Sequence, residues 1–111
     1  MEAERRRSPR LAVRFCLRAE WDAGDRIAAQ EVVTESISAH GALLKVVSEH
    51  PPTKKILLVN LTSHEQQVAR VVSVDPVPEI PGSHLVRVEF DVPAPQFWGP
   101  ESLDLDGGLE F

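Results

Sequence analysis

The chain has 111 residues, which is enough for one domain built around a single modest core. Its 42% hydrophobic and 26% charged residues are ordinary for a soluble globular protein, and no apolar run approaches the roughly 20 residues that span a bilayer. Cys16 is the only cysteine, which excludes an internal disulfide. Because the charged N-terminus also lacks the apolar stretch of a signal peptide, we expect a cytoplasmic protein.

The net charge of -5 is divided unevenly along the chain. Residues 1–18 carry six arginines against two glutamates, whereas the remainder carries six Lys and Arg against fifteen Asp and Glu. This asymmetry predicts that the basic segment meets an anion. The acidic body would repel a long polyanion, so no long nucleic acid is expected as a partner.

The first predicted strand covers residues 11–22, where apolar and polar side chains alternate with a period of two. Its expected buried face is formed by Val13, Phe15, Leu17, Ala19 and Trp21. Further strands are predicted where turn signals separate apolar stretches. They cover residues 27–37, 42–47, 54–61, 65–75 and 84–92.

The last strand is expected to place Val86, Val88, Phe90 and Val92 on one face. No ten-residue window has a helical stripe, and only a short turn of helix is expected, near residues 100–105. Six short strands predict an all-β fold, a small closed or nearly closed antiparallel β-barrel with little helix, because closure removes exposed strand edges.

The predicted organisation has three parts. Residues 1–10 form a basic arginine-rich arm, residues 11–92 form the barrel, and residues 93–111 form an irregular acidic C-terminal segment. Within that last segment, Phe97 and Trp98 are expected to pack across the open end of the barrel, with a partner-facing position as the alternative.

The first stretch that carries chemistry is "RRSPR" at residues 6–10. Pro9 forces Ser8 out of the helical region, so the arginines lie along an extended or turn-like segment. A guanidinium can grip a phosphate with two parallel hydrogen bonds, stack on a base, or pair with guanine. The alternative is a solvated tail without a ligand.

The second stretch is "SISAHGALL" at residues 36–44. Gly41 lies between two predicted strands, where a positive φ is expected, and Ser36 and Ser38 precede it. A serine-lined strand end with a glycine lets a ligand approach the backbone. The alternative is a turn in which the serines cap their own backbone.

Taken together and in this order, the two stretches resemble the PilZ family, whose domains are six-stranded β-barrels that bind the bacterial second messenger cyclic di-GMP. The family signatures are RxxxR before the first strand and D/N-x-S-x-x-G after the second. Arg6 and Arg10 fit the first, and Ser38 and Gly41 fit the second. Arg5 extends the first to the common RRxxxR. The resemblance covers roughly residues 4–92 and includes "VRVEF" at residues 86–90.

The resemblance implies a role for each of these residues. Arg6 and Arg10 would hold guanine and phosphate with help from Arg5, Ser38 would contact phosphate or base, and Gly41 would keep the surface open. Ser36 occupies the position of the family's Asp or Asn. Its single oxygen cannot match two acceptors, which could cost about 1–3 kcal/mol of binding free energy.

The sequence therefore predicts a cyclic di-GMP sensor that changes its surface for an unidentified protein partner when the nucleotide orders the arm. One alternative is a PilZ adaptor that has lost the ligand and acts through protein contacts. The other is a small barrel that binds single-stranded nucleic acid, although 5% aromatic residues supply few stacking platforms. No catalytic spacing, no metal-ligand spacing and no membrane insertion are predicted, so we expect neither an enzyme nor a cofactor.

Overall fold

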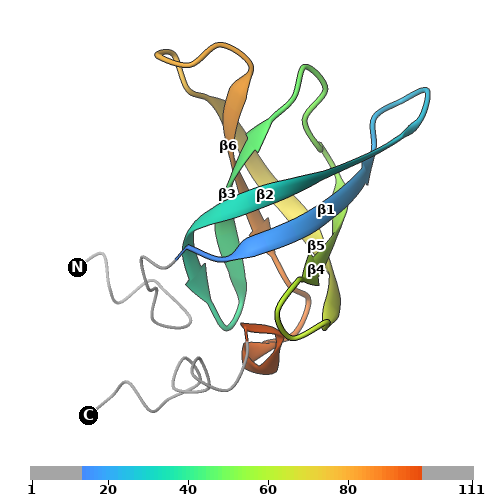
Figure 1. Ribbon diagram of the computed structural model, residues 1–111, viewed down its shortest axis with the longest axis vertical. Helices are drawn as coiled ribbons and strands as arrows, with labels where there is room; N and C mark the ends of the chain where they lie inside the picture. Colours follow the sequence, from blue (N-terminus) through green and yellow to red (C-terminus); the bar gives the residue numbers. More distant parts are fainter. Residues whose placement is uncertain (1–13, 99–111) are drawn as a thin grey trace.

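Six strands close into an antiparallel β-barrel in the computed structural model of the chain, which describes residues 14–98 (Figure 1). The strand order around the barrel is β1-β2-β3-β6-β5-β4. The strands are β1 (Cys16–Asp22), β2 (Ile27–Ser38), β3 (Gly41–Val47), β4 (Lys55–Asn60), β5 (Gln66–Pro76) and β6 (Ser83–Glu89), and a short 3-10 helix, η2 (Pro95–Trp98), follows them. The fold class predicted from the sequence is confirmed.

The barrel is filled by one row of side chains from each strand, because successive residues of a strand point to opposite faces. In β1 the predicted inward row is confirmed: Leu17, Ala19 and Trp21 are at most 3% exposed, and Phe15 packs partly buried against the core. Val13, the fifth predicted member of this row, lies outside the described residues.

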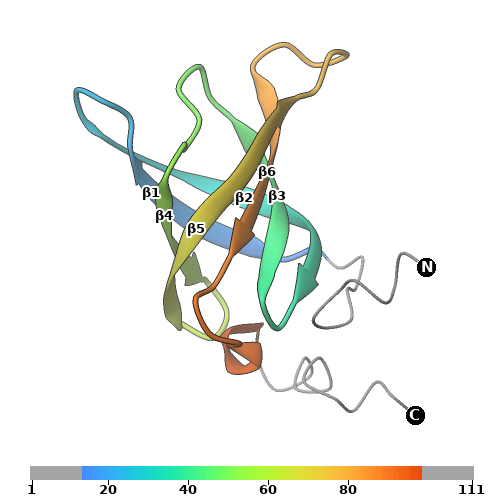
Figure 2. The ribbon, with the colours of Figure 1, turned by 180° about the vertical axis from the view of Figure 1, so that it is seen from behind.

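Helix η2 seals one end of the barrel, beneath the β2–β3 and β4–β5 turns (Figures 1 and 2). Phe97 and Trp98 are each 1% exposed, and their ring centroids lie 4.8 Å apart in an edge-on contact. Trp98 also packs 6.2 Å from Phe90, and the side-chain amide of Asn60 donates to the Phe97 carbonyl at 2.8 Å. The expected packing of Phe97 and Trp98 across the barrel end is confirmed.

Most strand limits lie within one residue of the predicted ones, and two differ by three residues or more. β1 begins at Cys16 because the Phe15 amide donates to the Thr34 hydroxyl at 2.8 Å instead of to a ladder carbonyl. β6 ends at Glu89, three residues before the predicted limit, and the Phe90 amide turns to the His40 carbonyl.

A consequence is that Val92 is 64% exposed, so it does not share the buried face of Val86, Val88 and Phe90. The short helix lies at residues 95–98, and the turn of helix expected near residues 100–105 falls outside the described residues.

Replacing Trp98 by Ala should lower the free energy of unfolding by about 3–5 kcal/mol, because the change removes a fully buried aromatic ring and leaves a cavity. Urea unfolding followed by circular dichroism measures the loss. The matched control is Val92→Ala, which truncates an exposed side chain nearby and should change the free energy by less than about 0.5 kcal/mol. Equal, small effects of both variants would mean that η2 is not part of the core.

Candidate functional site

A bulge in β2 turns Ser36 towards the outside of the barrel. Thr34 pairs with Leu44 and Ser36 pairs with Leu43, so Glu35 is one extra residue between them. An extra residue of this kind reverses which residues face the core. Thr34 is fully buried on the inner side, whereas Ser36 is half-buried on the outer side and its hydroxyl makes no hydrogen bond to another described residue.

Ser38 ends β2 two residues further along, and it is only 8% exposed. It pairs with Gly41, so Ala39 and His40 form a two-residue turn between β2 and β3. The Ser38 hydroxyl accepts from the His40 amide at 3.2 Å, and the Ser38 carbonyl accepts from the Trp98 indole at 2.9 Å. The strand end is therefore fixed by its own turn on one side and by η2 on the other.

Gly41 does not have the positive φ expected from the sequence. It starts β3 and is buried against β6, where it pairs with Glu89. A Cβ added at this position would lie well inside van der Waals contact with the Val88 carbonyl oxygen. The glycine is needed here because the backbone of β6 passes directly over it, so its role is close strand packing.

The chain reaches the barrel beside the β2 bulge. The Phe15 amide donates to the Thr34 hydroxyl at 2.8 Å, and the Thr34 amide donates to the Phe15 carbonyl at 3.1 Å. Arg14 directly precedes this pair and is exposed.

Three of the predicted site residues, Arg5, Arg6 and Arg10, lie outside the described residues, so the structure does not place them. Ser36, Ser38 and Gly41 are brought together at one barrel end. An extended chain covers about 3.3–3.6 Å per residue, so the four residues from Arg14 back to Arg10 span at most about 14 Å.

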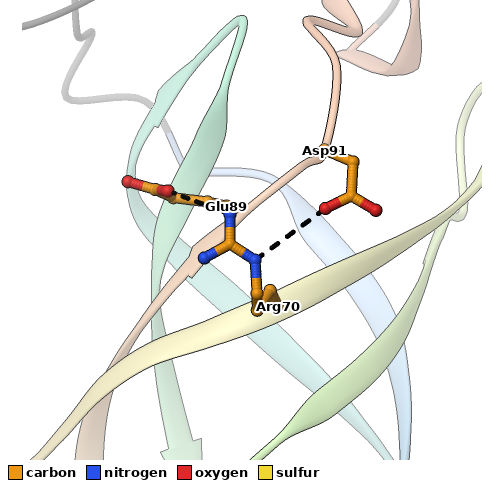
Figure 3. A network of polar contacts seen from close by, with 3 residues as sticks. All are labelled: Arg70, Glu89 and Asp91. Carbon is orange, nitrogen blue, oxygen red and sulfur yellow. Dashed lines mark hydrogen bonds and ion pairs between the residues drawn. The ribbon is translucent and has the colours of Figure 1, made fainter.

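Arg70 belongs to neither sequence motif, but the sheet topology brings it close to Gly41. Arg70 of β5 pairs with Glu89 of β6, which pairs with Gly41 of β3, so two strand spacings of about 4.8 Å separate Arg70 from Gly41. The Arg70 guanidinium lies 3.4 Å from a Glu89 carboxylate oxygen and 3.8 Å from Asp91 (Figure 3).

The Arg70 side chain is 56% exposed, and exposed ion pairs of this kind contribute at most about 1 kcal/mol. An anion arriving at this end of the barrel can therefore compete for the guanidinium. Only the strand order reveals the proximity, because Arg70 is far from both motifs in the sequence.

The comparison with protein-family models decides what kind of barrel this is. The model of the PilZ domain matches residues 4–97, which includes both sequence motifs and every strand. The chain belongs to the PilZ family. PilZ domains bind cyclic di-GMP and often protein partners, and they are binding and adaptor domains with no catalytic activity of their own. A search among curated proteins found no match to this chain.

Between residues 14 and 98, no helix combines the length and the apolar character that crossing a membrane requires. Over the same residues, no three His, Cys, Asp or Glu side chains are grouped so that they could hold a metal ion.

Replacing Gly41 by Ala should destabilise the fold by about 1–3 kcal/mol, the usual cost of overpacking, because the new methyl group forces β3 away from the Val88 carbonyl. Thermal unfolding of parent and variant measures the change. Ala29→Val, which adds bulk at an exposed position of β2, serves as the control and should change little. A fully stable Gly41→Ala variant would contradict the close approach of β6.

Proposed function

We propose that this PilZ domain is a cytoplasmic cyclic di-GMP sensor that changes the surface it offers to a protein partner. The observation that carries the proposal is the contact of Phe15 with Thr34 beside the β2 bulge, which brings the start of the described chain to the barrel end where Ser36, Ser38 and Gly41 lie. A ligand held by both motifs is thereby in contact with the arm and with the barrel at once.

The chemistry of binding follows from the residue types. Arg6 and Arg10, assisted by Arg5, supply guanidinium groups that match both a phosphate and the acceptor edge of guanine. The half-buried Ser36 hydroxyl offers a donor to the second side of the ligand, and the Ser38 hydroxyl, which is mostly buried, keeps its own donor beside it. Arg70 adds a cation two strands away from Gly41, and its guanidinium would exchange Glu89 and Asp91 for a phosphate.

The switch requires that ligand binding favours one arrangement of the arm over others. Phe15, the second described residue, has its ring centroid 5.5 Å from that of Trp98. Trp98 also donates to the carbonyl of Ser38. Ordering of the arm by the ligand would therefore act directly on η2, and the altered surface would include residues around this helix.

The second candidate is a PilZ adaptor that acts through protein contacts without the nucleotide. The observation that favours it is Ser36, a short side chain where the family has Asp or Asn, together with the Ser38 hydroxyl already occupied by the His40 amide. Single-stranded nucleic acid fits less well. Trp21, Phe90, Phe97 and Trp98 are each at most 3% exposed and offer no outer stacking platform.

Calorimetric titration with cyclic di-GMP tests the sensor directly. The parent should bind, and the double variant Arg6→Ala/Arg10→Ala should show no detectable binding, because each charge-assisted contact contributes roughly 1.5–3 kcal/mol. Both positions precede the first strand, so the circular dichroism spectrum should stay that of the parent.

The matched control is Arg26→Ala/Lys54→Ala, which removes two exposed cations at the other end of the barrel and gives the same net charge. It should bind like the parent. If the arginine-arm variant binds as the parent does, the arm is only a solvated tail. If the parent itself does not bind cyclic di-GMP, the ligand-free adaptor is favoured.

Ser36→Asn should tighten cyclic di-GMP binding by roughly twofold to tenfold. The longer amide reaches a guanine edge from the outer face, and one added hydrogen bond contributes about 0.5–1.5 kcal/mol. Paired titrations in one buffer measure the change. Ser73→Asn, which follows the irregularity in β5, is the control and should leave the affinity unchanged. Weaker binding by Ser36→Asn would show that Ser36 does not replace the family's Asp or Asn.

A further inference from the structure

The seam between β1 and β4, meaning the line along which these two strands pair, is the shortest of the barrel, and the two strands separate before β1 ends. Their register contains four residue pairs, from Leu17 opposite Asn60 to Glu20 opposite Leu57, whereas β1 and β2 share seven pairs. β1 continues to Asp22 and β4 begins at Lys55. Among the described residues, the last two of β1 and the first two of β4 therefore have no partner across this seam.

The separated strand ends border a groove of about 870 Å³. The β1–β2 hairpin forms one wall and the β3–β4 loop forms the other, and the two lie side by side at the upper end of the barrel in Figure 1. Leu57 and Val68, a cross-strand pair of β4 and β5, contribute an apolar floor. Val68 is 53% exposed, which leaves this floor open to a ligand.

The two strand edges of the groove carry opposite charge. Glu20 and Asp22 line the β1 edge and Lys54 and Lys55 line the β4 edge, while Glu49 adds one carboxylate on the β3–β4 loop. Within residues 14–98, neither lysine has an ion-pair partner, although Glu20 is held by Arg18 at 3.0 Å. A segment that places a cation towards Asp22 on the β1 edge and an anion towards Lys54 and Lys55 on the β4 edge would match the charge of both strand edges.

The walls are held in place without a ligand. The buried Trp21 indole donates to the His50 carbonyl at 2.8 Å, which fastens the β3–β4 loop to β1. Pro51 and Pro52 restrict the backbone of the same loop, since each proline ring fixes φ. A groove with fixed walls loses little conformational entropy when it is filled.

We propose that this groove binds an extended segment of a partner protein. An apolar side chain of the segment packs on Leu57 and Val68, and a basic and an acidic residue on either side meet the β1 and β4 rims. The segment pairs its backbone with the unpaired strand ends, as in recognition by strand addition. The groove lies at the end of the barrel opposite to the β2–β3 turn, and the inference does not rest on cyclic di-GMP binding.

Selection from phage-displayed random short peptides on the immobilised full chain provides the probe. The enriched peptides should share an apolar residue between a basic and an acidic one. Titration of the best synthetic peptide into the isotope-labelled chain should shift the amide signals of residues 20–24 and 53–57. Val68→Glu should weaken the peptide at least about tenfold, because the new carboxylate must lose its water beneath an apolar side chain.

The control is Val72→Glu, which introduces the same charge at a 47% exposed position of β5 that does not line the groove. It should change the affinity less than about twofold. If Val68→Glu disturbs the spectrum of the free chain, Lys55→Glu at the exposed rim replaces it, with the same expected loss for peptides that carry the acidic residue.

The proposal is wrong if the selection enriches no peptides over the unselected library. It is also wrong if the amide shifts are confined to residues 36–41, or if both valine variants lose the same peptide affinity. Cyclic di-GMP titration of Val68→Glu separates the two sites. The nucleotide affinity should equal that of the parent, and a parent that does not bind the nucleotide leaves the peptide result standing.

Discussion

The hydrogen bond from the Trp98 indole to the Ser38 carbonyl is the contact on which the candidate site depends. It joins the last described residue of the chain to the end of β2, sixty residues earlier in the sequence. An indole N–H in a dry interior must find an acceptor, because leaving it unpaired costs the full desolvation of a polar group. Ser38 therefore stays where Trp98 holds it, and the β2–β3 turn cannot move without disturbing the core.

The barrel end that contains this hydrogen bond differs in its properties from the opposite end. One end is closed by aromatic rings and presents hydroxyls beside the point where the arginine-rich segment joins the barrel. The other end is open along the β1–β4 seam and mixes apolar and charged side chains. The closed barrel keeps these two surfaces apart.

Much of the fold could be predicted from the sequence, because alternation with a period of two is visible wherever one face of a strand is buried. Leu17, Ala19 and Trp21 illustrate this. The exact end of β6 could not be predicted, because Val92 continues the pattern while the backbone has already left the ladder for His40.

The candidate site was only partly predictable. Motif spacing located Ser38 and Gly41, but the reason for the glycine is the Val88 carbonyl, a neighbour 47 residues away that no local pattern indicates. The bulge at Glu35 leaves only a faint signal in the sequence. The apolar residues Val32 and Ile37 are both buried although they are five positions apart, whereas a regular strand separates residues of one face by an even number of positions. The sequence carries no signal for Arg70, because its proximity to Gly41 follows from the order of the strands alone.

That strand order also determines how the chain must fold. β1 completes its hydrogen bonds only when β4 has formed, and β3 waits for β6, so the two pairings that close the barrel join segments far apart in sequence. Such non-local pairings make closure slow, since loop entropy is lost before contacts compensate for it. Until then the β1–β2 hairpin has an unpaired edge, and Arg18 and Glu20 on β1 place charges that discourage association with another unfinished chain. Glu20, which lies at the rim of the finished groove, thus also protects the incomplete chain until β4 pairs with β1.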